Sequence, residues 1–115
     1  MNPIEKVQLL QDREALRERI VDCFRNLNPE KIILFGSSAR GEPDQWSDLD
    51  LILVIPTRKR FLDRLEEAYL CWTLPVSADI LVYTPEEFER MRLEGNAFLS
   101  EAIAHGVVLY EKSGR

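Results

Sequence analysis

Three aspartates stand out because each lies within or beside a run of apolar residues. Asp48 and Asp50 begin the segment DLDLILV, and Asp79 lies within VSADILV. Side chains alternate between the two faces of a strand, so Asp48 and Asp50 project to one side with Cα atoms about 6 to 7 Å apart. One divalent cation could contact both. An ionised carboxylate in an apolar strand is costly unless it is paired, hydrogen-bonded or bound to metal, and Asp50 therefore predicts a site.

Taken singly, the acids have ordinary structural explanations. Asp48 could end a loop, and Asp79 could lie on an edge strand, where it points to water or pairs with an arginine. Three acids in two apolar strands weaken both explanations. Because carboxylate oxygens are the ligands and no histidine or cysteine accompanies them, Mg²⁺ or Mn²⁺ is favoured over zinc.

A glycine turn follows an earlier apolar run, in the segment LFGSSARG. A strand that ends in such a turn, before a segment able to start a helix, presents backbone amides to an anion, and glycine lets phosphate oxygens approach closely. Ser37 adds a hydroxyl donor and Arg40 a guanidinium. A glycine at this place is often purely structural, and the lysine of a P-loop is absent.

Strands and helices must bring these residues together. Helical apolar spacing predicts helices over residues 3–27, 58–72, 85–95 and 97–105, the first either continuous or broken near Gln11-Asp12. Apolar runs predict strands over residues 31–35, 49–55, 76–83 and 107–110. Thr84 and Glu87 match a capping box. This alternation predicts an α+β fold with a small mixed sheet and flanking helices.

Length, composition and charge narrow the function. The 115 residues suit one domain, 1–115, with an N-terminal helical part (3–27), a core (31–83), and C-terminal helices with a strand (84–111). The net charge of -5 argues against a long nucleic acid as partner, since binding phosphates requires surplus Lys and Arg. No apolar run approaches the roughly 20 residues of a membrane helix, and the first residues are too charged for a signal peptide. We therefore expect a cytoplasmic protein without a membrane partner.

Taken together, the motifs resemble a known family. Gly36-Ser37, ten further residues and then Asp48-x-Asp50, with Asp79 on a later strand, are similar to the signature of the polymerase-beta-like nucleotidyltransferase superfamily. The short chain and the GSSARG…SDLDL segment resemble its minimal nucleotidyltransferase (MNT) branch. Members of that branch are antitoxin partners of HEPN-domain toxins in prokaryotic toxin–antitoxin pairs. The likeness extends over about residues 31–83.

The resemblance implies a polymerase-beta-like palm, ATP or another nucleoside triphosphate as substrate, and two Mg²⁺ ions. The residues implied for nucleotide binding are Gly36, Ser37, Arg40 and Ser47, and those implied for metal binding and catalysis are Asp48, Asp50 and Asp79. The implied chemistry is attack of a hydroxyl on the α-phosphate with loss of pyrophosphate. In the minimal branch the acceptor is a hydroxyl of the HEPN toxin, often on a tyrosine. We therefore expect an Mg-dependent protein adenylyltransferase that silences its partner.

Two positions depart from the family pattern, and two other functions stay open. Ser38 stands where many relatives carry arginine, which would weaken phosphate binding, and Trp46 could stack on a base or pack on the core. The chain could be a non-catalytic module that neutralises its partner by occlusion, or it could modify a small molecule such as an antibiotic. An occlusion module gains nothing from three mutually repelling carboxylates, which favours catalysis.

Overall fold

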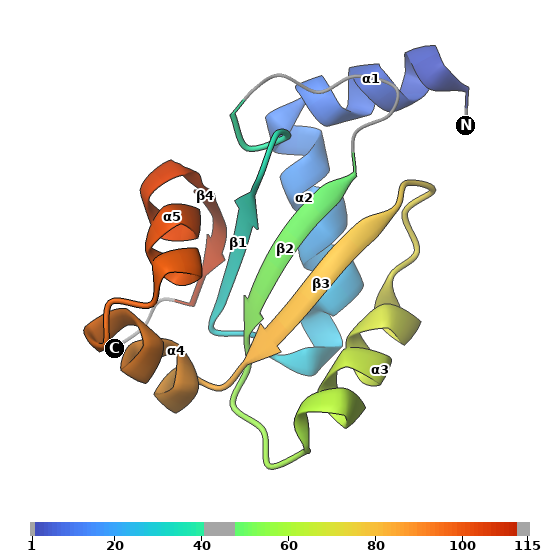
Figure 1. Cartoon of the computed structure of the whole chain (residues 1–115). Coiled ribbons are helices and arrows are strands. Elements are labelled where there is room, and N and C mark those ends of the chain that lie inside the picture. The colour runs from blue at the N-terminus through green and yellow to red at the C-terminus, as the bar shows by residue number, and fades with distance from the viewer. Residues whose placement is uncertain (1, 41–47, 113–115) are drawn as a thin grey trace.

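A computed structural model describes residues 2–40 and 48–112 and confirms the predicted α+β fold, a four-stranded mixed sheet with helices on both faces (Figure 1). The helices are α1 (Pro3–Gln11), α2 (Arg13–Phe24), α3 (Phe61–Cys71), α4 (Pro85–Leu93) and α5 (Ala97–His105), and a 3-10 helix, η1, spans Arg25–Leu27. The strands are β1 (Lys31–Phe35), β2 (Leu49–Val54), β3 (Ala78–Tyr83) and β4 (Val107–Glu111). Within the described part of the chain, no helix is both long enough and apolar enough to cross a membrane.

The sheet places the predicted site residues side by side. Its strand order is β3-β2-β1-β4. Strand β1 runs antiparallel to β2 and β4, whereas β2 and β3 are parallel and are connected through α3. In this register Asp50 of β2 lies opposite Phe35 of β1 on one side and opposite Asp79 of β3 on the other. The end of β1, just before Gly36, therefore lies level with the acids of β2 and β3 in the sheet.

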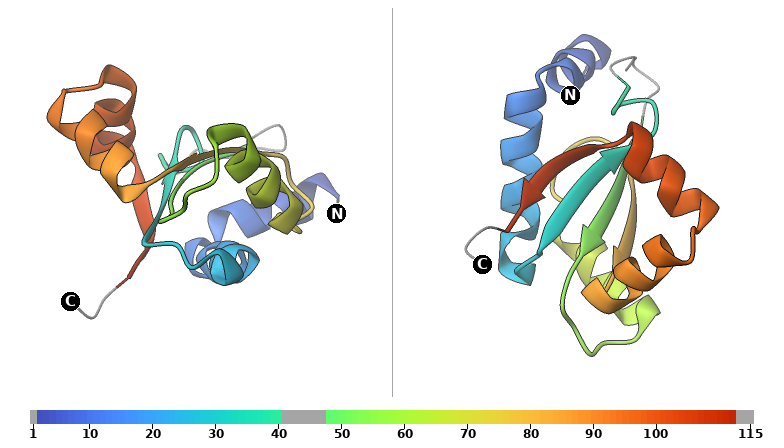
Figure 2. Two further views of the ribbon diagram at one scale, coloured as in Figure 1. Left: turned by 90° about the horizontal axis from the view of Figure 1, so that it is seen from below. Right: turned by 90° about the vertical axis from the view of Figure 1, so that its left-hand side faces the viewer.

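Alternation along β2 divides its side chains between two cores. Leu49, Leu51 and Leu53 belong to the larger core, which α2 and α3 cover, and Ile52 and Val54 belong to a smaller core with residues of α4 and α5. Figure 2 shows α2 on one side of the sheet and α4 and α5 on the other. Asp50 shares the face of the smaller core by alternation. On β2 the smaller core ends at Ile52. Asp50, the next residue on the same face, is therefore only half-buried.

The N-terminal helical region is two helices, the second of the two predicted alternatives. The Asp12 amide donates to the carbonyls of Gln8 and Leu9 at the end of α1. The Asp12 side chain then accepts from the amide of Ala15 at 3.1 Å and caps α2. One aspartate thus ends one helix and begins the next, which makes Arg13 the first residue of α2.

Most predicted boundaries lie within a few residues of the observed ones. The capping box is confirmed, because the Glu87 amide donates to Thr84 Oγ1 at 3.1 Å and the Thr84 amide donates to Glu87 Oε1 at 2.9 Å. Strand β3 begins two residues later than predicted. Val76 is held outside the ladder, because its carbonyl accepts a hydrogen bond of 2.8 Å from the Trp72 indole.

Candidate active site

The glycine turn begins where β1 ends. Gly36 has φ +76°, a conformation that side chains disfavour, and a Cβ added there would lie 2.3 Å from Asp50 Oδ2. Glycine is therefore required twice, for the backbone conformation and for the space. The amide of Ala39 donates to the Gly36 carbonyl at 3.1 Å, and the amide of Arg40 donates to the Ser37 carbonyl at 3.1 Å. The predicted helix start is thus a single helical turn within the described residues.

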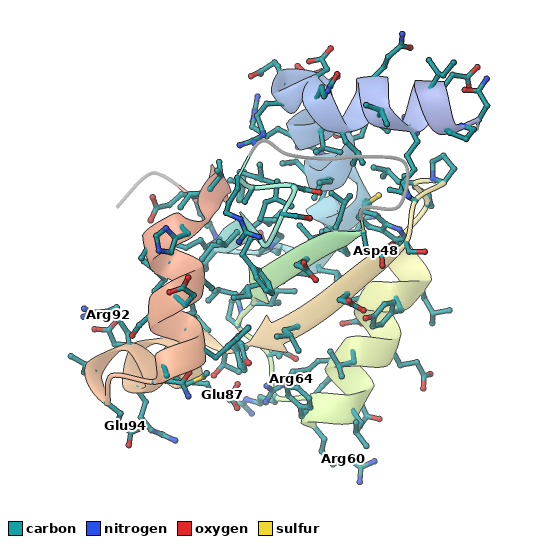
Figure 3. All side chains as sticks on the ribbon, turned by 45° about the horizontal axis from the view of Figure 1, so that its top comes forward. Asp48, Arg60, Arg64, Glu87, Arg92 and Glu94 are labelled. Atoms are coloured by element: carbon teal, nitrogen blue, oxygen red, sulfur yellow. The ribbon has the colours of Figure 1, made fainter. Side chains whose placement is uncertain are left out.

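The three aspartates differ in exposure and in their neighbours. Asp48 and Asp79 are exposed, whereas Asp50 between them is half-buried. Burial is the main cause that raises the pKa of Asp50, followed by the charges of Asp79 and Asp48 and by a side-chain hydrogen bond with Asp79. The acid of the later strand therefore lies on the same face as the other two. Figure 3 shows Asp48 where β2 begins, at this end of the sheet.

The three carboxylates have the right chemistry to bind a hard divalent cation, but their side chains are not arranged closely enough to coordinate one together. Their oxygens are the ligands that Mg²⁺ prefers, and a cation would offset the repulsion around Asp50. The absence of a side chain at Gly36 leaves the space beside Asp50 Oδ2 free. Among residues 2–40 and 48–112, no three Asp, Glu, His or Cys side chains gather closely enough to hold a metal ion. Asp50 and Asp79 are in contact, and Asp48 is linked to them here only by charge.

Ser38 and Arg13, neither of which was predicted as a site residue, make hydrogen bonds that involve the glycine turn. Ser38 is 1% exposed, and its hydroxyl donates to the main-chain carbonyl of Asp48 at 3.3 Å. The guanidinium of Arg13 donates to the carbonyls of Ser38 and Ala39 at 3.3 and 3.4 Å. Ser38 stands where many members of the family that the sequence resembles carry arginine, and its side chain is buried against the residue that precedes β2. A small hydroxyl residue after the glycine was the available signal, whereas Arg13 carried none.

Arg40 lies at the exposed end of the turn, beside a cavity of about 280 Å³ between the turn and α5. Phe98 and His105 of α5 also line this cavity. His105 ends α5, and its Nε2 lies 3.5 Å from Glu101 Oε1. Ser47, predicted as a nucleotide ligand, and Trp46 fall outside the described residues.

Comparisons with known proteins concern the family and the fold of the chain. The family model of the nucleotidyltransferase domain matches residues 17–112. A crystal structure from Sulfolobus solfataricus, described as a candidate nucleotidyltransferase, has a TM-score of 0.58 and 20% identity, covering 95% of this chain and 83% of that chain. A crystal structure of a toxin-antitoxin with AMP-PNP has a TM-score of 0.58 and 20% identity, covering 84% of this chain and 74% of that chain. At this identity the two structures show a shared fold. No curated protein sequence matches this chain closely enough to count as a relative.

Proposed function

The chain belongs to the nucleotidyltransferase domain family, and from that premise we propose that it transfers a nucleotidyl group, AMP from ATP, to a hydroxyl of a cognate HEPN toxin and so acts as its antitoxin. One observation carries the proposal. Asp50 lies between Gly36, whose added Cβ would touch its Oδ2, and Asp79, its register partner. A turn suited to phosphate and the acids suited to catalysis are therefore immediate neighbours.

Each described site residue has its own role in the proposed nucleotidyl transfer. The backbone of Gly36 and Ser37, with the Ser37 hydroxyl and Arg40, would bind the β- and γ-phosphates. Asp48, Asp50 and Asp79 would hold two Mg²⁺ ions, which supply charge neutralisation of the leaving pyrophosphate and activation of the acceptor oxygen. Asp79 is the exposed acid of the edge strand β3, so the acceptor hydroxyl would enter on that side and donate its hydrogen bond there.

The partner and the cytoplasmic setting belong to the same proposal. The resemblance of the GSSARG and SDLDL segments to minimal nucleotidyltransferases supports a HEPN-domain toxin as acceptor. The structural neighbour that is a toxin-antitoxin with AMP-PNP supports a nucleotide as the bound substrate. The net charge of -5 supports a protein acceptor over a long nucleic acid.

The test is label transfer. The purified chain is incubated with Mg²⁺, ATP labelled at the α-phosphate and the HEPN protein of the neighbouring reading frame, and the partner is analysed by mass spectrometry. We expect wild type to add the mass of AMP and Asp48→Ala plus Asp50→Ala to add none. Asp22→Asn is the matched control, because this acid of α2 pairs with Arg25 at a position 68% exposed and far from the site in sequence. Equal labelling by the double variant would exclude the carboxylate mechanism.

A second candidate, neutralisation of the partner by occlusion, is favoured by one observation, namely that the described acids are not gathered into a metal ligand set. A protection experiment in cells distinguishes the two candidate functions. If the chain protects against the toxin while the partner never gains mass, and the double variant protects equally well, occlusion is the function. If protection and added mass are lost together, transfer is the function.

A further inference from the structure

Arg13 makes hydrogen bonds to the main chain of the glycine turn. It is the first residue of α2, and its Nη2 donates to two successive carbonyls of the turn, those of Ser38 and Ala39. A guanidinium that donates to carbonyls at the end of a helical turn satisfies them and complements the negative end of the turn dipole. The free amides of such a turn lie at its opposite end, and Gly36, the first residue of this turn, lies beside Asp50.

Ser38 connects this turn to the acidic strand. Its carbonyl accepts from Arg13, and its hydroxyl donates to the carbonyl of Asp48, ten residues further along the chain. With 1% of its surface exposed, Ser38 cannot reach a phosphate in the surrounding solvent. The two hydrogen bonds join three segments, which are the start of α2, the glycine turn and the start of β2. We name the pair Arg13 and Ser38 the turn brace.

The described hydrogen bonds of the Arg13 guanidinium are made to the turn itself, whereas Arg17, one turn further along α2, pairs with Glu14 at 2.7 Å. We propose that the turn brace positions the site: Arg13 holds the phosphate-binding amides in place, and Ser38 holds Asp48 at a set distance from them. Its effect on catalysis rests on the proposed nucleotidyl transfer, but its effect on the turn does not.

The first test measures the turn directly and requires no activity. Amide hydrogen exchange is followed by NMR at Ala39 and Arg40, whose N–H groups close the turn. Loss of one hydrogen-bonding side chain corresponds to about a tenfold change in an equilibrium, so Arg13→Gln should speed exchange at these amides by about that factor. Arg17→Gln removes the same charge from the same helix and should leave both rates unchanged. Unchanged rates in Arg13→Gln overturn the proposal.

The second test separates positioning from general loss of structure. Arg13→Gln should raise the KM for ATP by about tenfold with a smaller change in kcat, because it loosens the phosphate-binding turn. Ser38→Ala should lower kcat by about tenfold with KM near wild type, because it releases Asp48. Arg13→Lys should recover part of the KM, since lysine keeps the cation but not the two-carbonyl fork. Losses that fall equally on kcat and KM and follow the melting temperature instead overturn the proposal.

The two proposals fail in different ways. If no partner protein gains AMP while exchange at Ala39 and Arg40 responds to Arg13→Gln as expected, the proposed function falls and the turn brace stands. If labelling proceeds normally while exchange and KM are unaffected by Arg13→Gln, the turn brace falls and the proposed function stands.

Discussion

Two half-buried carboxylates lie near opposite ends of the parallel strands β2 and β3, and their surroundings are opposite as well. Asp50 lies at the start of β2, where burial and the charges of two further aspartates raise its pKa. Glu87 follows the end of β3, where the Arg64 guanidinium is the main cause that lowers its pKa. Arg64 donates to both Glu87 oxygens, at 2.7 and 3.2 Å.

The difference supports a functional role for Asp50, as proposed, and a structural role for Glu87. Glu87 has every partner a carboxylate needs, because Arg64 is 10% exposed beside it and the Thr84 amide completes the capping box. Asp50 has an acid for a neighbour and a glycine beside it in place of a compensating cation. An arrangement that costs stability without compensation in the protein itself is typical of a site that awaits a ligand. Substitutions on the two sides of this contrast should therefore have different effects on activity and stability.

The largest effect is expected from Asp50→Asn. This change removes the proposed central metal ligand and should lower nucleotidyl transfer by about a thousandfold or more, which corresponds to several kcal/mol of transition-state stabilisation. It should not lower the melting temperature, since it also removes repulsion among three acids. Label transfer and thermal unfolding check the two parts. A stable fold with undiminished transfer would place Asp50 outside the chemistry.

Gly36→Ala should be next in size. The new Cβ meets Asp50 Oδ2 at 2.3 Å and occupies a residue with φ +76°, so we expect a loss of about 1 to 3 kcal/mol in the free energy of unfolding, together with loss of nucleotide binding. Gly95→Ala is the matched control, because Gly95 has φ +69° but nothing within 4 Å of the added Cβ. Only the backbone cost, about 1 kcal/mol, should appear there. Equal losses in the two variants would show that contact with Asp50 is unimportant.

Glu87→Gln should reverse the pattern of Asp50→Asn. The change leaves the mostly buried Arg64 without its carboxylate and weakens the clamp between α3 and α4, which should cost about 1 to 2 kcal/mol of stability. Transfer activity measured well below the melting temperature should stay at the wild-type level. Denaturant unfolding measures the first quantity. Glu89→Gln, whose partner Arg92 is 52% exposed, should change neither.

The smallest expected effect is a change in the free energy of unfolding at low pH. The pKa of Glu87 is lowered from its ordinary value of 4.5, so the unfolded chain binds the proton more readily than the folded chain. The stability that this carboxylate contributes is therefore fully present above pH 4.5 and is lost as pH falls through the folded pKa. The difference in unfolding free energy between wild type and Glu87→Gln should be constant near neutral pH and shrink in acid. A difference that grows in acid would contradict the assigned sign.

Local patterns in the sequence predicted much of this structure correctly. The apolar run before Gly36 is β1 at its predicted residues, and the Thr84 capping box is present with both of its hydrogen bonds. Such features depend on neighbouring residues alone, which is why they can be predicted without a sheet. The break at Asp12 was one of two alternatives, and hydrogen bonds within a few residues of that position decide it.

The sequence by itself determined which residues are proposed to carry the chemistry, because two acids two residues apart at the start of an apolar strand and a glycine after another strand can be recognised without any tertiary contact. Only the tertiary structure decided that Asp79 lies beside Asp50, because that depends on the parallel register of β2 and β3. It also turned Ser38 inward and brought Arg13 to the turn from 25 residues away. Contacts between distant segments follow from how helices pack on the sheet, and no local periodicity encodes them.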